Sequence, residues 1–478
     1  MTTRFSLNPV CLLLFAAAFA RAETVNPEYR PEPLPQAMPE FRQPETPAAV
    51  LPSAETGHIT DIDEAGLLAQ PQLLNRLLDQ SVMDNDIEGI RVLLPVYRKL
   101  PDTVRDDILL RLAKSKLSMY EGRFAEAASL LRGLIAEKPE SDVIRFHLAL
   151  ALFYDNQDRA AQDQIDKLLA QTALPEREKN LLAAFQEELQ KRHRWRFDGG
   201  LNYTYEPNIN NAPAVKQEGR LKSEAEAENV SGIAYRFGAE KDRPLTGNWL
   251  AKFSADLYGK YYPSAKHYND LAVQAAAGIG YRNANRAFSL MPYAQHRRFG
   301  EDAEPYSDSF GTKFDTDIRL NPKWRIINHV AAEKIRYENR TRFNGNILRF
   351  GQTVVYQADP RQAWFGGYEF ERENLRDRDN SNRRQAVSLG WIQEWPKGFS
   401  SRASATWGKR TYRAPMPWPI LETRRDRTLG LNLSLWHRNI HFWGVTPRLT
   451  MRHTRNRSNV FLYDYRKNNL FVEMTKTF

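Results

Sequence analysis

The stretch "LFVEMTKTF" at residues 470–478 carries an apolar or aromatic side chain at every second position except one: Leu470, Val472, Met474 and Phe478. A strand that crosses lipid turns one face toward acyl chains and the other toward a polar lumen, so apolar side chains recur with a period of two. The stretch therefore predicts the closing strand of an outer-membrane β-barrel. Lys476 is the exception to the pattern, and a soluble β-sandwich can also end on an alternating strand.

The segments that precede this stretch repeat the alternation. From Trp195 onward we count about fourteen segments of strand length, and the alternation is clearest at 249–257, 271–279, 310–318, 429–435 and 445–451. All ten tryptophans lie at or beyond Trp195, as expected where aromatic side chains collect at the two membrane interfaces. The predicted fold for 195–478 is a 14-stranded antiparallel transmembrane β-barrel.

The first residues predict export from the cytoplasm. A positive Arg4, an apolar core and an Ala-Arg-Ala site indicate a secretory signal peptide at 1–22. Eight prolines follow, which predicts an extended linker at 23–57. Cys11 is the only cysteine and lies inside the predicted signal, so the mature chain is expected to have no disulfide and no thiolate metal site.

Charge divides the chain near residue 194. Residues 195–478 carry 45 Lys and Arg against 29 Asp and Glu, a net of +16, whereas residues 1–194 carry 23 against 29, a net of −6. The basic residues are scattered between alternating strands and are not clustered on a helix, which argues against a nucleic-acid partner. Residues that line the lumen and loops that contact anionic outer-membrane lipid are the expected users of this charge.

The region 58–194 has a helical period instead. A 34-residue repeat aligns "YEGRFAEAASLLRGLIAEKPES" with "YDNQDRAAQDQIDKLLAQTALP", so that Ala127 matches Ala161. This period is typical of tetratricopeptide repeats, in which small residues let two helices pack closely and Gly122 or Asn156 turns the chain between them. "GIRVLLPVYRKLP" at 89–101 is a candidate third, degenerate repeat. We expect a periplasmic tetratricopeptide-like domain.

Stacked repeats leave a concave groove lined by the first helix of each pair. In the predicted register the groove residues, and the candidate client-binding residues, are Lys116, Tyr120, Phe146 and Tyr154. Ordinary packing between repeats is an equal alternative for Phe146 and Tyr154.

Signals for catalysis are weak. Ser434 and His437 are three positions apart on a strand, so they are expected to face opposite sides. We find no metal-binding spacing, paired acidic cluster or Gly-rich phosphate loop, and we predict no catalytic residue, no metal and no cofactor. The chain is therefore not expected to be an enzyme.

The order of these regions resembles one family, the surface lipoprotein assembly modulators of Gram-negative bacteria. Shared strings are "GIRVLLPVY" at 89–97, "INNAP" at 209–213, "RFGAEK" at 236–241, "LSLWHR" at 433–438, "GVTPRLT" at 444–450 and "FVEMTKTF" at 471–478. The resemblance implies an outer-membrane translocation factor that delivers particular lipoproteins to the cell surface. It brings no motif residue with an assigned chemical role.

The resemblance and the domain order together predict that the helical repeats receive a lipoprotein client and that the barrel provides its route. Candidate further partners are periplasmic lipoprotein carriers and the barrel assembly machinery. The alternative is an exopolysaccharide export porin, which also joins tetratricopeptide repeats to a barrel. Rows of aromatic and acidic residues along a sugar path would favour this alternative. A passive porin is a third reading, but a simple pore needs no client-binding domain.

Overall fold

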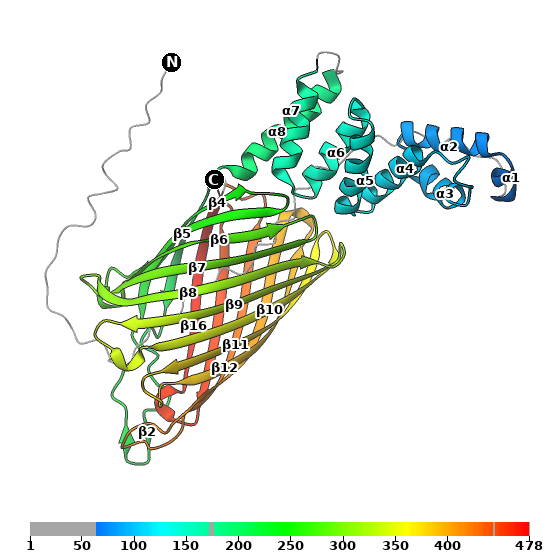
Figure 1. Cartoon of the computed structure of the whole chain (residues 1–478). Helices are drawn as coiled ribbons and strands as arrows, with labels where there is room; N and C mark the ends of the chain where they lie inside the picture. The colour runs from blue at the N-terminus through cyan, green and yellow to red at the C-terminus, as the bar shows by residue number, and fades with distance from the viewer. Residues whose placement is uncertain (1–63, 172–175, 443–444, 478) are drawn as a thin grey trace.

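The computed structural model describes residues 64–171, 176–442 and 445–477. Helices occupy the first part of this range and extend from one end of a closed β-barrel (Figure 1). This confirms the predicted fold class. The predicted signal peptide and linker, and the terminal Phe478, lie outside the described residues.

Eight helices are described: α1 (Glu64–Ala69), α2 (Pro71–Met83), α3 (Ile87–Tyr97), α4 (Asp107–Tyr120), α5 (Phe124–Glu137), α6 (Asp142–Tyr154), α7 (Asp158–Leu169) and α8 (Glu176–His193). Tight turns with positive φ join α2 to α3, α4 to α5 and α6 to α7, at Asn85 (56°), Gly122 (75°) and Asn156 (58°). Glycine and asparagine adopt this left-handed conformation at the lowest steric cost. The same turn thus recurs in three helical hairpins. Within the described part of the chain, no helix is long and apolar enough to cross a bilayer.

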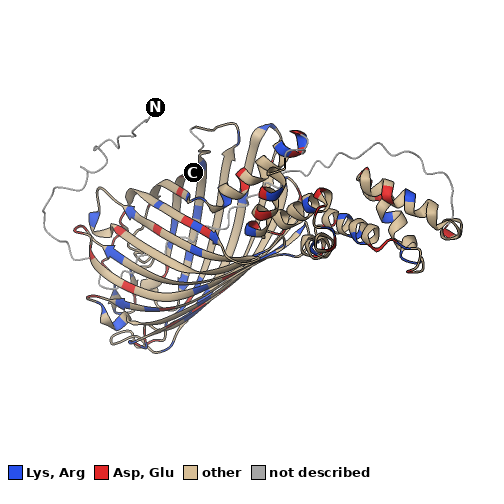
Figure 2. Cartoon of the chain, turned by 45° about the horizontal axis from the view of Figure 1, so that its top comes forward, with Lys and Arg blue, Asp and Glu red and all other residues tan. Residues whose placement is uncertain are grey.

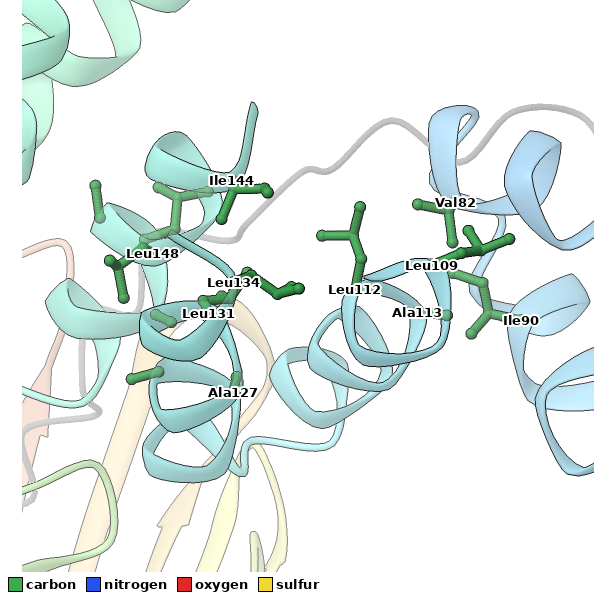
Figure 3. Packing of buried hydrophobic residues seen from close by; sticks show 14 of the residues in the cluster. Val82, Ile90, Leu109, Leu112, Ala113, Ala127, Leu131, Leu134, Ile144 and Leu148 are labelled. Carbon is green, nitrogen blue, oxygen red and sulfur yellow. The ribbon is translucent and has the colours of Figure 1, made fainter. Parts of the chain in front are cut away.

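One apolar core runs through the helices (Figure 3). Ala127 and Ala161 are fully buried, which fits the expected close approach of paired helices. Leu131 and Leu134 are also fully buried between neighbouring hairpins, and truncating such a leucine to alanine typically costs about 2–5 kcal/mol. The Asp106 side chain caps α4 by accepting from the Ile108 amide at 2.8 Å.

Fourteen of the described strands close the barrel: β1 (Arg196–Glu206), β4 (Val230–Pro244), β5 (Trp249–Tyr261), β6 (Asp270–Arg282), β7 (Arg286–Phe299), β8 (Glu304–Arg319), β9 (Trp324–Tyr337), β10 (Gly345–Asp359), β11 (Gln362–Leu375), β12 (Asn382–Glu394), β13 (Phe399–Tyr412), β14 (Arg425–His437), β15 (Arg448–Ser458) and β16 (Tyr465–Thr477). Each pairs antiparallel with its sequence neighbour, and β1 closes on β16. The short strands β2 (Gln217–Glu218) and β3 (Leu221–Lys222) form a separate hairpin.

The connections differ between the two ends of the barrel. At the end that bears the helices most are short, such as 283–285 and 360–361, whereas the opposite end has longer ones, such as 207–229 and 413–424. The expected strand that includes Val445 begins later, at Arg448, because Val445 instead forms an isolated bridge with Phe442.

Side chains alternate between the two faces of the wall as expected. Along β14 the outward leucines at 429, 431, 433 and 435 are 41–48% exposed. Between them the inward Asn432 accepts a hydrogen bond from Arg452 Nε at 2.8 Å. Toward the helical end, outward aromatic rings of neighbouring strands contact one another, with 4.7 Å between the ring centroids of Trp324 and Tyr356. An apolar belt with an aromatic rim and a polar interior is the pattern of a membrane-spanning barrel.

Candidate functional site

Lys116, predicted to line the groove, lies inside the helical domain. It sits on α4 with only 7% of the residue exposed, and its Nζ donates to the Val82 carbonyl oxygen at 2.5 Å. That carbonyl belongs to the last turn of α2, where carbonyl groups lack helical partners. Burial lowers the pKa of the Lys116 ammonium to about 8. The groove position expected for Lys116 is therefore wrong, because the side chain joins two helices.

Phe146 and Tyr154 of α6 pack between helices, which is the alternative to lining the groove. The Tyr154 ring stacks on Phe124 with 5.2 Å between centroids and meets Phe185 of α8 edge-on at 6.1 Å. Phe146 packs partly buried against the helical core and contacts the His147 ring edge-on at 5.8 Å. Both side chains thus hold neighbouring helices together.

Tyr120 is the one candidate that is open to solvent. It ends α4 and is 60% exposed, while the Arg91 guanidinium lies 5.4 Å from its ring centroid. Two other large apolar side chains are equally open on the preceding helices, Met83 at 65% and Val92 at 64%. The sequence pattern missed these two, although each interrupts a polar helix face. The structure does not gather the four predicted residues into one groove.

A buried carboxylate joins the helices to the barrel. Asp158 begins α7, and its side chain is fully buried. Arg192 Nη1 and His193 Nε2 of α8 lie 2.9 Å and 3.5 Å from its oxygens, and Arg282 Nη2 at the end of β6 lies 3.4 Å away. Because a buried charge needs partners, this arrangement fixes the last helical hairpin against the barrel rim.

A second buried carboxylate, Asp242 of β4, continues the network. Its oxygens lie 2.8 Å from Lys252 Nζ, 3.4 Å from Arg282 Nη1 and 3.6 Å from Arg196 Nη2. Arg282 therefore bridges Asp158 and Asp242. We call this set of residues, with Arg192 and His193, the junction cluster; sequence reasoning missed it because its members lie far apart along the chain.

The turn between β4 and β5 adds a direct contact with the helices. Asn248 Nδ2 donates to the Asp155 carbonyl oxygen, in the turn after α6, at 2.6 Å. Burial raises the pKa of the Asp155 carboxyl and lowers the pKa of the His193 imidazole. The last two helical hairpins are thus held by polar contacts at the mouth of the barrel.

Among the described residues, the ladder between β1 and β16 has the fewest paired positions of the barrel. Among the described residues this ladder has eight paired positions, from Asp198 opposite Thr477 to Tyr205 opposite Leu470, whereas β9 and β10 share twelve. At the end away from the helices the segment after β1 crosses this seam, because Asn211 Oδ1 accepts from Lys467 Nζ of β16 at 3.1 Å. Asn211 lies in the "INNAP" string.

The inner wall is polar, and several of its carboxylates are paired with cations. Lys and Arg recur along the strands together with acidic residues (Figure 2). Examples of paired carboxylates are Glu206 with Lys260 at 2.9 Å and Glu333 with Arg349 at 2.5 Å.

In the described part of the chain, Ser434 and His437 do not form a catalytic pair. Ser434 points inward and shares a hydrogen bond with Thr450 at 2.8 Å, while His437 packs on the opposite face against the Phe399 ring at 4.7 Å. Within 64–171, 176–442 and 445–477, no three His, Cys, Asp or Glu side chains converge as a metal site.

These features define a class, an outer-membrane β-barrel with a helical-repeat module fixed to one rim. The family model described as surface lipoprotein assembly modifier matches residues 195–478, and that of its N-terminal tetratricopeptide repeats matches 60–165. The chain belongs to the surface lipoprotein assembly modifier family.

Relatives of the same description extend over most of the chain. Surface lipoprotein assembly modifier 1 of Neisseria meningitidis serogroup B is 34% identical over 98% of this chain and 95% of its own length. Surface lipoprotein assembly modifier 1 of Haemophilus influenzae is 35% identical over 87% of both chains. The Moraxella catarrhalis protein is 34% identical over 87% of this chain and 82% of its own length.

Proposed function

We propose that this protein delivers specific lipoproteins from the periplasm to the cell surface. The family supports assembly of surface lipoproteins as the task, and the closed barrel supplies a path across the outer membrane. In this proposal the helical domain lies in the periplasm, because lipoproteins reach the outer membrane from that side. The first barrel strand, β1, begins at the helical rim, and the last strand, β16, ends there. The longer connections extend from the other end of the barrel, as in outer-membrane barrels.

The junction cluster is the observation that carries the proposal. It places the last repeat hairpins at the mouth of the barrel through Asp158, Arg282 and Asp242, so a client held by the repeats would already be next to its route. Periplasmic lipoprotein carriers are the expected donors of that client. The barrel assembly machinery is expected to insert the protein, as for barrels in general.

Within the helical domain, the client-contact candidates are now the exposed apolar residues at 83, 92 and 120. They lie on three successive helices, α2, α3 and α4, and exposed apolar side chains that lie together would mark a binding surface. Tyr120 remains from the predicted set, while Lys116, Phe146 and Tyr154 pack inside the helical domain.

An exopolysaccharide path is less well supported. Such a path would present unpaired acidic groups beside aromatic rings to bind sugar hydroxyls, but the inward carboxylates named above are paired with cations. A polar wall of this kind also suits an unfolded or partly folded polypeptide, which carries both signs of charge.

The contact surface is tested with Tyr120→Ala combined with Val92→Ser. Client exposure at the surface is measured by protease shaving of whole cells, and barrel insertion by heat-modifiable migration on a detergent gel. We expect at least a threefold loss of client exposure with normal insertion. The matched control is Val143→Ala combined with Leu181→Ala, two exposed apolar residues on α6 and α8. Equal client exposure for both double variants would exclude residues 92 and 120 as the contact.

A further inference from the structure

Cations crowd the outer face of the barrel at the end opposite the helices. On β11 to β15, outward positions near that end carry six basic residues, which we call the basic band: Arg372, Arg383, Lys409, Arg425, Arg427 and Arg457. They share their face with the outward Trp407 and Leu429, which directly oppose each other across β13 and β14. The band therefore lies on the lipid side of the wall.

Several members of the basic band directly oppose one another across strands. Arg372 is paired with Arg383, Lys409 with Arg427, and Arg427 with Arg457. Like charges directly opposite each other destabilise a sheet. No carboxylate lies within 4.0 Å of any of the six cations in the part of the chain that the structure describes. We therefore expect the cations of the basic band to bind anions that do not belong to the chain.

A pocket opens within this band. It has a volume of about 330 Å³, and its lining includes Arg372, Arg383, Lys409 and Arg413 but no acidic residue. Asn374 Oδ1 accepts from Arg413 Nη1 at 2.9 Å and from Arg372 Nε at 3.2 Å. A neutral amide thus orients two guanidinium groups without neutralising them. Guanidinium groups with free donors bind phosphate through charge-assisted hydrogen bonds.

The depth of the basic band matches a headgroup layer. Toward the membrane centre, the next outward residue is apolar on three strands: Phe370 on β11, Trp407 on β13 and Leu429 on β14. On β12 and β15 the polar Gln385 and Arg455 come first, and the apolar Val387 follows Gln385 on β12. Cations just beyond an apolar and aromatic belt lie where lipid phosphates are found. Neighbouring strands are about 4.8 Å apart, so the band is wide enough for a headgroup that carries two phosphates.

We propose that the pocket and the basic band bind the phosphates of the phosphorylated glycolipid, lipid A, in the outer leaflet. The choice of leaflet rests on the proposed function, which puts the helices in the periplasm and the basic band at the cell surface. A bound bisphosphorylated headgroup removes the repulsion between opposed cations and anchors β11 to β15.

A matched control exists on β9 at the same end of the barrel. Lys334 and Arg336 also face outward there, but the carboxylate of Asp308 lies directly opposite Arg336 in the β8–β9 ladder and 2.7 Å from His296 Nδ1. The cations of this site have an internal counter-charge, so we expect no anion site.

The test measures binding of lipid A to full-length protein in detergent by native mass spectrometry. Arg383→Gln combined with Lys409→Gln should weaken binding of bisphosphorylated lipid A at least tenfold, whereas Lys334→Gln combined with Arg336→Gln should change it less than twofold. Dephosphorylated lipid A and phosphatidylglycerol should bind the wild type at least tenfold more weakly. Heat-modifiable migration verifies that each variant is folded.

Equal binding by the two double variants would overturn the site, and equal binding of phosphatidylglycerol would overturn the glycolipid assignment. Client exposure measured in the same strains separates this inference from the proposed function. Loss of lipid binding with normal client exposure leaves lipoprotein delivery standing. A wild type that binds lipid A but exports no client contradicts lipoprotein delivery alone.

Discussion

At the scale of single residues, an arginine substitution should destabilise the barrel differently on the two faces of β14. Leu433 is 41% exposed on the outward face, and Asn432 faces the lumen beside Arg452. Leu433→Arg should destabilise the barrel by about 2–4 kcal/mol if the residue lies near the midplane. Asn432→Arg should cost less than about 1 kcal/mol, because water in the lumen screens the added charge. Unfolding in guanidinium chloride compares the two variants, and equal losses would refute the assigned faces.

A partly buried histidine, His147 of α6, makes the helical domain sensitive to acid. Burial, with the nearby Lys116 charge, lowers the pKa of the His147 imidazole to about 3, so the folded domain keeps it neutral while the unfolded chain takes up a proton below about pH 6.5. The resulting stability is fully present above pH 6.5 and is lost as the pH falls toward 3.

His147→Phe should therefore flatten the fall in the unfolding temperature of the helices between pH 7 and pH 4, followed by circular dichroism at 222 nm. His441→Gln, an exposed change on the β14–β15 connection, serves as the control and should leave the wild-type slope. The same slope in His147→Phe would show that other groups cause the acid sensitivity.

Lys116 shows what the sequence could not supply at this scale. Periodicity predicted that Lys116 lies on a helix, which α4 bears out, but the side chain is buried and does not line the predicted groove. Its hydrogen-bond partner is a backbone carbonyl of α2, at Val82, 34 residues earlier, and no side-chain pattern reveals an unpaired carbonyl. Tyr120, in contrast, ends its helix next to the turn at Gly122, and its exposure follows from that local geometry.

At the scale of elements, most of the fold could be predicted because its signals are local. A 34-residue period and the turn residues Gly122 and Asn156 specify two hairpins, and the third is confirmed by the same turn at Asn85. Strand alternation specifies fourteen segments. The start of β15 was missed because Val445 continues the alternation in sequence while its backbone turns back to pair with Phe442.

The β1–β16 seam carries a prediction of its own. Leu201 and Met474 are directly opposite and face outward, and such pairs are close enough for a disulfide. Because Cys11 is the only native cysteine, Leu201→Cys with Met474→Cys can be oxidised selectively. The short ladder leads us to expect that oxidation lowers client surface exposure at least threefold and that a reductant restores it.

Ile326→Cys with Val354→Cys, in the twelve-position ladder of β9 and β10, is the matched control and should export normally after oxidation. If the oxidised seam pair also exports normally, the client does not need the wall to open and passes through the lumen.

At the scale of the whole molecule, the two parts act as one unit because of the junction cluster. Asp158 and Arg282 are 124 residues apart and meet at 3.4 Å. Neither residue belongs to a sequence motif. The order of the helical and barrel regions could therefore be predicted from the sequence, but the contact that joins the two regions could not. The attachment explains how an acidic repeat module can serve a basic barrel: it fixes the last helices, α7 and α8, at the barrel rim.

Surface exposure of a client measures delivery of lipoproteins by this chain most directly. Cells expressing a candidate surface lipoprotein with the full chain, with residues 195–478 behind a signal peptide, or with neither are shaved with protease, and the surviving client is quantified. We expect that the full chain makes the client protease-accessible, and that the barrel alone does so much less although it is inserted. A client that stays protected in the presence of the inserted full chain, for every lipoprotein tested, would contradict delivery of lipoproteins by this chain.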